Sequence, residues 1–183
     1  MSGCHRIILP LLICTTLVGC ATRRRAQPQT PTIRIDPAAL ASSPPIHPDA
    51  QWRVRVPLGS VPQVDHICQL SDQYQLIEIK TPTRWRAFCA QTGLPADAPC
   101  PDFTQGVAVG LVALVGEPAD GTWPTAINEV RLQRDGAAWL RTRFRTGLYR
   151  PLLVDAYCNL AYVKGLRRVI LVEINRRAFL TTH

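Results

Sequence analysis

Histidine is scarce in this chain of 183 residues, which contains four of them. His5 and His183 lie near the ends and His47 in a proline-rich stretch, so only His66 falls within the part that we expect to fold. A Ser-His-Asp or Cys-His arrangement needs a histidine beside a nucleophile and a carboxylate, and no Gly-x-Ser-x-Gly context is present. The scarcity of histidine therefore argues against a hydrolase triad.

The sequence patterns of other catalytic and cofactor sites are missing as well. The spacing of Gly116 and Gly121 lacks the Lys-Ser/Thr of a phosphate-binding loop, and no C-x-x-C pair occurs. The acidic residues that could form a glycosidase pair sit at expected strand edges or turns, where solubility and capping explain them. We therefore expect no enzymatic activity, no cofactor and no metal. The acidic residues in question are Asp102, Glu117, Asp120, Asp155 and Glu173.

No apolar run is long enough to cross a bilayer as a helix, which needs about 20 residues. The run at residues 7–18 follows Arg6 and is closed by Thr22 and Arg23. Its length and flanks are typical of the apolar core of a secretory leader, which is removed from the mature protein. We therefore predict a leader and no transmembrane helix at the N-terminus.

The leader ends in Leu17-Val18-Gly19-Cys20, which resembles the bacterial lipobox. The resemblance implies that the Cys20 thiol is acylated and that the chain is cut before it. Each buried CH₂ contributes about 0.8 kcal/mol, so an anchor of two or three acyl chains would hold the protein firmly to the lipid bilayer. We expect a lipid-anchored protein of the cell membrane or outer membrane that faces the extracytoplasmic side. The alternative is an ordinary leader cut nearby, with Cys20 as an incidental thiol.

Lysine and acidic residues are few, whereas arginine is abundant. The 21 basic residues include only two lysines, Lys80 and Lys164, and 13 acidic residues leave a formal net charge of +8. A basic protein favours anionic neighbours, and outside the cytoplasm these are lipid headgroups, acidic polysaccharide or an acidic protein. We expect no nucleic-acid partner.

Composition divides the chain into three parts. Residues 1–19 are the leader, residues 20–51 are a lipid-anchored spacer, and residues 52–183 have room for a single domain. Proline fixes φ and removes a donor, so the proline-rich spacer should be mostly extended. The prolines of the spacer are Pro28, Pro31, Pro37, Pro44, Pro45 and Pro48.

Four cysteines remain once the leader and the acylated residue are set aside. An even number of cysteines outside the cytoplasm predicts two disulfides, with three possible pairings. The segment that contains Cys89 should end near Gly93 and return through two prolines, so we expect a Cys89–Cys100 bridge, which leaves Cys68 for Cys158. Metal ligation is the alternative, but the spacings are wide.

Hydrophobic periodicity predicts strands along most of the domain. Alternating residues at 52–56 and 75–79 indicate two strands with one dry face each. Residues 107–115 lack a polar side chain, which predicts a central strand covered on both faces, and residues 169–172 follow the same pattern. Further strands are expected at 127–133, 138–145 and 152–163.

One helix is expected between the second and third of these strands. Thr83 can cap its start, and Gly93 ends it. Trp85, Phe88 and Cys89 recur at helical spacing between those two points. The fold class is therefore α+β, mainly an antiparallel β sheet or sandwich with one helix, after the extended proline-rich spacer.

The hairpin at Arg134-Asp135-Gly136 has a predictable register. A two-residue loop would place Val130 opposite Arg141, which mixes a core position with a charged one. A three-residue loop, with Gly136 in the left-handed conformation, keeps apolar residues together. This register pairs Val130 with Leu140, Leu132 with Ala138 and Glu129 with Arg141.

The same register gives the hairpin an arginine-rich solvent face beside Trp139. Such a row is either an ordinary solvated surface or a surface for an anionic partner. Glu129 can offset only part of its charge. The arginines of this candidate face are Arg131, Arg141, Arg143 and Arg145.

Several short motifs follow one another in a recognisable order along residues 74–174. The motifs are Leu76-Ile77, the helix with Trp85 and Phe88, Pro101-Asp102-Phe103, the apolar strand, Gly116-Glu117 and a turn at Gly121. In this order the chain resembles the C-terminal domain of the PrcB family, named for a protease-complex subunit. The resemblance implies a small, non-catalytic, mostly β envelope domain that assists or binds an exported partner. It also implies structural roles for the motifs, with the Asp-Phe pair opening a strand and the Gly-Glu pair closing it.

These features lead us to expect a membrane-anchored, non-catalytic envelope lipoprotein. Its domain would be a binding or assembly module for an exported protein or an anionic envelope partner. The alternative is a purely structural envelope protein whose domain only fills or spaces.

Overall fold

The computed structural model describes residues 42–95, 97–145 and 149–181. These residues form ten strands in two five-stranded sheets and one complete helix, α2 (Pro82–Thr92). No helix among them combines the length and the apolar character needed to cross a membrane. The coarse prediction of a mainly antiparallel β protein with one helix is confirmed.

The two sheets, which we call sheet A and sheet B, differ in one respect. All neighbouring strands of sheet B are antiparallel, whereas sheet A contains one parallel pair, β7 with β9. Sheet B has the order β2 (Ala50–Val56), β8 (Tyr149–Lys164), β5 (Gly106–Pro118), β4 (Tyr74–Ile79) and β3 (His66–Ser71). Sheet A has the order β1 (Pro45–Ile46), β6 (Thr125–Leu132), β7 (Ala137–Phe144), β9 (Arg168–Ile174) and β10 (Arg177–Leu180).

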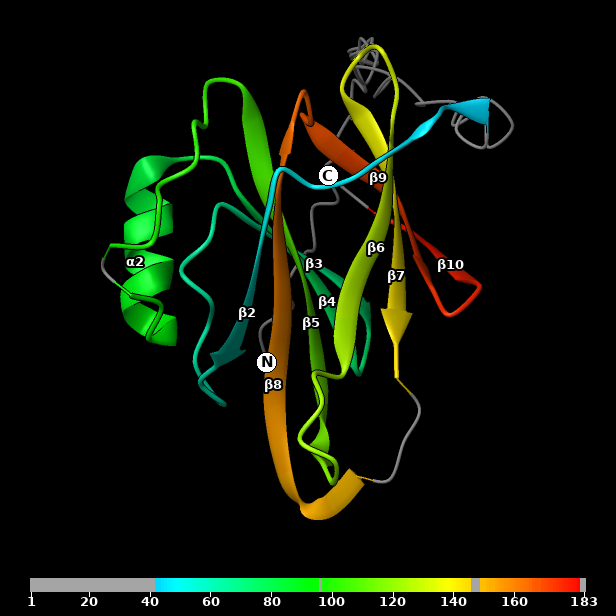
Figure 1. The fold of residues 1–183 in the computed structure, drawn as a ribbon. Helices are drawn as coiled ribbons and strands as arrows, with labels where there is room; N and C mark the ends of the chain where they lie inside the picture. Colours follow the sequence, from blue (N-terminus) through cyan, green and yellow to red (C-terminus); the bar gives the residue numbers. More distant parts are fainter. Residues whose placement is uncertain (1–41, 96, 146–148, 182–183) are drawn as a thin grey trace, which may run out of the picture. The chain divides into compact units, whose positions relative to one another are not determined.

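Strand β5 lies at the centre of sheet B and is buried on both faces, as its unbroken apolar run predicts. Val109 and Leu111 belong to a hydrophobic cluster that also contains residues of sheet A. Ala108 and Val112 belong to a second cluster, which α2 helps to form. Figure 1 shows α2 on one side of sheet B and the strands of sheet A on the other.

Helix α2 begins two residues earlier than the sequence pattern suggests. The cap is Thr81 and not the predicted Thr83, because the Thr81 hydroxyl accepts a hydrogen bond from the Arg84 N–H at 3.3 Å. Pro82 fits the first helical turn, where its missing N–H has no intrahelical partner to lose. The predicted end at Gly93 is confirmed, since this residue has a left-handed φ of 68°.

The single dry face predicted for β4 is wrong. Leu76 packs in the cluster that both sheets share, and Ile77 packs on the opposite face under α2. Glu78 is fully buried as well, with its carboxylate 2.6 Å from the Lys80 ammonium. The alternation of apolar and polar residues therefore underestimates burial where a paired carboxylate occupies a covered position.

Strand β9 is not a central strand covered equally on both faces. Val169 and Val172 point into the shared cluster, as expected. On the other face, Ile170 packs only against a small cluster that includes Ala137 and Trp139. Because β9 is the fourth of five strands in sheet A, its apolar pattern overstates how deeply it lies.

Two buried polar side chains of sheet B bond to the backbone of sheet A. The Asn159 amide oxygen accepts a hydrogen bond from the Ile127 N–H at 2.7 Å. Glu78 Oε1 accepts one from the Val169 N–H at 3.3 Å. Such buried bonds are costly to lose, so they fix β6 and β9 relative to sheet B.

The predicted hairpin register is confirmed. Val130 pairs with Leu140 and Glu129 pairs with Arg141 across β6 and β7. Gly136 has a φ of +83°, and a Cβ there would lie 2.8 Å from the carbonyl oxygen of Gly165. A side chain is therefore excluded at this turn by both conformation and space.

The folded part begins before Trp52. Pro45 and Ile46 pair with Arg131 and Val130, and the Asp49 carboxylate accepts a hydrogen bond from the Lys164 N–H at 2.9 Å. The last residues of the predicted spacer thus take part in the domain. Residues 20–41 of that spacer lie outside the described residues.

Candidate binding pocket and arginine face

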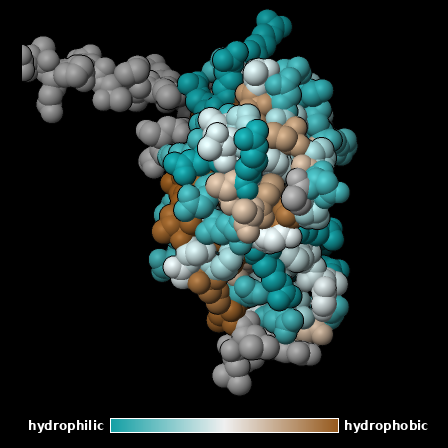
Figure 2. Space-filling model, turned by 90° about the vertical axis from the view of Figure 1, so that its left-hand side faces the viewer, coloured by the Kyte–Doolittle hydropathy of each residue, from teal (hydrophilic) through white to brown (hydrophobic). Residues whose placement is uncertain are grey.

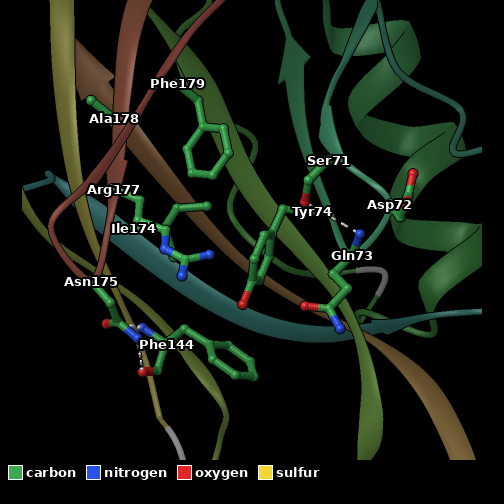
Figure 3. Close-up of a pocket in the computed structure, with 10 residues that line it drawn as sticks. All are labelled: Ser71, Asp72, Gln73, Tyr74, Phe144, Ile174, Asn175, Arg177, Ala178 and Phe179. Carbon is green, nitrogen blue, oxygen red and sulfur yellow. Dashed lines mark hydrogen bonds between the residues drawn. The ribbon is translucent and has the colours of Figure 1, made fainter.

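A pocket of about 900 Å³ lies where one end of β7 and the β9–β10 turn of sheet A meet the β3–β4 turn of sheet B. We call it the aromatic pocket. Figure 3 shows the side chains that line it, which come from three separate stretches of the chain. They are Ser71, Asp72, Gln73, Tyr74, Phe144, Ile174, Asn175, Arg177, Ala178 and Phe179.

Aromatic rings form much of the pocket wall. The rings of Tyr74 and Phe144 meet edge to face, with centroids 5.5 Å apart and an interplanar angle of 69°. Tyr74, Phe144 and Phe179 also pack against the cluster that both sheets share, which fixes their positions. Burial raises the pKa of Tyr74, and the positive charge of Arg177 opposes that shift. The pocket therefore offers a rigid apolar surface beside a cation.

Arg177 supplies the positive charge of the pocket. Its guanidinium group points into the pocket on the side of Tyr74 in Figure 3. No carboxylate of the described residues forms an ion pair with Arg177, although Asp72 lies on the rim. An apolar concave surface with one oriented charge is the usual chemistry of a binding site for an apolar group that carries an anion.

The β9–β10 turn is held in place by Asn175. The Asn175 amide oxygen accepts a hydrogen bond from the Phe144 N–H at 3.0 Å, and its amide nitrogen donates one to the Phe144 carbonyl at 2.6 Å. Asn175 and Arg176 both have a positive φ, of 48° and 71°. This turn therefore connects the end of β7 rigidly to the wall of the aromatic pocket.

The four arginines of the predicted arginine face lie as expected, but three of them have carboxylate partners. Arg131 pairs with Glu129, whose pKa it lowers through a hydrogen bond. Arg141 lies 3.0 Å from Glu129 and 3.3 Å from Glu173. Glu173 therefore joins Glu129 in balancing the positive charge of these arginines. Arg145 lies 3.6 Å from Asp120 in an exposed pair, which is the fourth arginine–carboxylate contact of this face.

Trp139 supports this face through its ring. The guanidinium carbons of Arg131 and Arg141 lie 5.4 Å and 5.0 Å from the ring centroid. Contacts of this kind stabilise exposed cations by about 0.5–1 kcal/mol. Arg143 is exposed and has no ion pair among the described residues. Of the four predicted arginines, Arg143 is therefore the one best placed to meet an external anion.

Cys68 and Cys158 cannot form the predicted bridge in this fold. Their strands, β3 and β8, are separated by β4 and β5. Neighbouring strands are about 4.8 Å apart, so the two residues are roughly 14 Å apart, whereas a disulfide needs Cα atoms within about 7 Å. They also point to opposite faces, because Cys68 packs in the shared cluster and Cys158 under α2.

Cys89 and Cys100, by contrast, line one hollow of about 350 Å³ beside α2. Burial raises the pKa of Cys89, and the neighbouring Cys100 adds to that shift. All four cysteines of the domain are free thiols in the structure. The placement keeps Cys89–Cys100 as the pairing to test.

We expect one disulfide, Cys89–Cys100, in protein exported to its own compartment. Such a short loop should contribute about 3 kcal/mol by chain-entropy reasoning. Cys68 and Cys158 should stay reduced and slow to alkylate, since both are buried and burial raises the pKa of Cys158. Mass spectrometry of non-reduced peptides after alkylation identifies both the disulfide-linked pair and the free thiols. A peptide that joins Cys68 to another cysteine would contradict the structure.

Cys20, the predicted acylation site, and the leader lie outside the described residues. His66 is the first residue of β3 and half-buried. Within the described ranges, no three histidine, cysteine, aspartate or glutamate side chains gather in a way that could hold a metal ion.

Sequence reasoning missed the β9–β10 hairpin and with it most of the aromatic pocket. The available signal was Asn175-Arg176 between an apolar strand and the short segment Arg177–Leu180, since Asn favours the left-handed turn of a two-residue hairpin. The pocket residues that were not singled out include Tyr74, Asn175, Arg177 and Phe179.

Asp102 and Phe103, one of the motifs behind the PrcB resemblance, make local hydrogen bonds and core contacts. Asp102 accepts hydrogen bonds from Thr104, chiefly from its side chain, which lower the pKa of the Asp102 carboxyl. Phe103 packs near Trp85 and Tyr162, with ring centroids 6.2 Å and 6.3 Å away. Asp102, Phe103 and Thr104 belong to the turn region that precedes β5.

Comparison with known proteins gave no match: no family model, curated protein or solved structure corresponds to this chain. The PrcB resemblance therefore stays a prediction from the sequence motifs.

Proposed function

We propose that this chain is a membrane-anchored, non-catalytic lipoprotein of the cell envelope whose β domain binds an extended segment of an exported protein. The observation that carries the proposal is the aromatic pocket, where Tyr74, Phe144 and Phe179 surround a space of about 900 Å³ beside the cation of Arg177. The leader, the lipobox-like motif at Cys20 and the PrcB resemblance support the location and the class.

The choice of an extended polypeptide rests on β10. This strand is the last of sheet A, so one edge of its backbone has no strand neighbour among the described residues. Edge strands pair readily with an extended segment, and an adjacent pocket then selects a side chain. Leu180 of β10 is 65% exposed and follows Phe179, so the strand that carries one wall residue of the pocket also presents an exposed apolar side chain on its other face.

The two sheets would hold this site open. We infer that they pack face to face as a sandwich, because one cluster contains inward side chains of both. The aromatic pocket then lies at an open end of that arrangement. The helix side of the molecule offers less apolar surface for a partner, since Figure 2 shows a largely hydrophilic surface there with small apolar areas.

Arg177→Glu is the variant that tests this function. Reversing the charge should strongly reduce recovery of a partner that brings a carboxylate to the aromatic pocket. Arg177 is exposed and forms no ion pair with any carboxylate that the structure describes, so the midpoint of thermal unfolding should barely change. A tag placed in the exposed turn at residues 57–60 keeps β10 free, and the recovered proteins are quantified from detergent-solubilised membranes.

Arg86→Glu is the matched control, because Arg86 is exposed on α2, on the other side of sheet B. We expect Arg86→Glu to recover the same proteins as the wild type. Equal recovery by the Arg177→Glu variant would contradict binding at the aromatic pocket. Recovery of nothing beyond background by the wild type would favour the purely structural role.

A further inference from the structure

A second hollow, of about 400 Å³, lies on the outer face of sheet A and shares Asn175 with the aromatic pocket. We call it the arginine hollow. Its charged and amide side chains come from β6, β7, β9 and the β9–β10 turn. They are Asn128, Arg141, Arg143, Glu173, Asn175 and Arg176.

The arginine hollow has an excess of positive charge. Arg141 is neutralised, because it lies between Glu129 and Glu173 at 3.0 Å and 3.3 Å. Arg143 and Arg176 are exposed, and no carboxylate of the described residues lies within 4.0 Å of either guanidinium group. Two cations are therefore left to face solvent across one hollow.

Arg176 occupies a backbone position that does not suit an arginine. Ile174 pairs with Arg177, so Asn175 and Arg176 form a two-residue hairpin loop, and both have a positive φ. Such loops strongly favour Asn-Gly, because glycine takes the left-handed conformation without a steric cost. Arginine at φ 71° is strained, and strain of this kind concentrates at functional positions.

The backbone segments that carry the two arginines are held together by hydrogen bonds. The Asn175 side chain bonds both the N–H and the carbonyl of Phe144, which directly follows Arg143. The Asn175 N–H donates to the Thr142 carbonyl at 3.4 Å. The backbones that carry Arg143 and Arg176 are thus tied together, so a ligand need not order them first.

We propose that Arg143 and Arg176 form a binding site for a phosphate group, separate from the aromatic pocket of the proposed function. Two guanidinium groups offer planar sets of donors that match the oxygens of a phosphate, and the charges are complementary. The phosphate belongs either to the headgroup of an anionic phospholipid or to a soluble phosphate compound. Asn128 adds an uncharged donor to the hollow.

The test compares the wild-type side chains with Arg143→Gln, Arg176→Gly and the double variant. All are made in a chain that carries Cys20→Ser behind a leader cut independently of Cys20, so that neither an acyl chain nor an uncut leader contributes. Binding is measured to phosphatidylcholine vesicles with and without phosphatidylglycerol, and by calorimetry to inorganic phosphate at matched ionic strength. Each basic residue at an anionic surface strengthens binding roughly 5-fold, so the double variant should bind phosphatidylglycerol vesicles about 25-fold more weakly.

Arg176→Gly separates binding from folding. Glycine relieves the strain of the loop, so this variant should unfold at the same temperature as the wild type or a higher one while binding less phosphate. Arg134→Gln, in the β6–β7 turn, is the control and should bind like the wild type. Loss of vesicle binding in the double variant identifies the headgroup as the source, and loss of phosphate binding alone identifies a soluble compound. Unchanged binding by the double variant, or a lower unfolding temperature for Arg176→Gly, would overturn the site.

Discussion

Replacing Cys20 with serine should abolish the incorporation of labelled palmitate and release the protein from the membrane. The reason is that acylation at the lipobox-like Leu17-Val18-Gly19-Cys20 supplies the only anchor that the proposal contains. At about 0.8 kcal/mol per buried CH₂, several acyl chains bind a bilayer far more strongly than an arginine-rich surface does. The substitution should move nearly all of the protein from the membrane fraction to the soluble fraction.

Two controls make the release experiment decisive. An uncut leader could itself hold the variant, so the fractionation uses a chain whose residues 1–19 are replaced by a leader that is cut independently of Cys20. Cys100→Ser removes an exposed cysteine of the domain and should leave the label and the membrane fraction unchanged. Label that persists in the Cys20→Ser chain, or membrane retention after a salt wash, would rule out the anchor.

Trp85→Ala should destabilise the domain by about 3–5 kcal/mol, the usual cost of deleting a buried tryptophan side chain. Trp85 is 2% exposed and packs α2 against sheet B, where its ring lies 4.8 Å from that of Trp52. This loss is a large part of the 5–15 kcal/mol by which a domain is usually stable. Urea unfolding followed by circular dichroism measures it.

Trp139→Ala is the comparison for this prediction. Trp139 is half-buried on the outer face of sheet A, where its ring contacts arginines rather than a closed core. We expect it to cost about 1–2 kcal/mol, clearly less than Trp85→Ala. Equal costs for the two tryptophans would mean that α2 does not pack on sheet B as described.

The features that could be predicted from the sequence depend on local patterns. Nine apolar residues in β5 require cover on both faces whatever surrounds them. The β6–β7 register follows from matching Val130 to Leu140, and Gly93 marks a helix end. In each case the side chains or the backbone within one element already restrict the structure to a single choice.

The features that could not be predicted depend on how distant strands pair. The parallel pairing of β7 with β9 and the position of β10 at the edge leave no mark in the local pattern. The Cys68–Cys158 bridge was derived by elimination, and it fails because strand order and side-chain face decide which thiols can meet. The aromatic pocket combines Tyr74, Phe144 and Phe179, which only the tertiary fold brings together.

One buried carboxylate and one residue with a positive φ account for the remaining differences. Glu78 looks like a solvent position in an alternating strand, yet it is buried beside Lys80 and bonds the backbone of β9. Arg176 sits where glycine is expected in a two-residue turn. The alternation rule fails at Glu78 because a bond to a distant strand compensates its burial. The turn rule fails at Arg176, we propose, because its side chain binds a phosphate group.

Site-specific photocrosslinking tests the central claim, binding at the aromatic pocket, most directly. A benzophenone side chain replaces Asp72 on the pocket rim or, as the reference, Arg86 on α2, both of which are exposed. The account predicts a discrete adduct with an exported protein from position 72, none from position 86, and loss of the first adduct when Arg177→Glu is added. Equal adducts from the two positions, or an adduct at position 72 that survives Arg177→Glu, would contradict it.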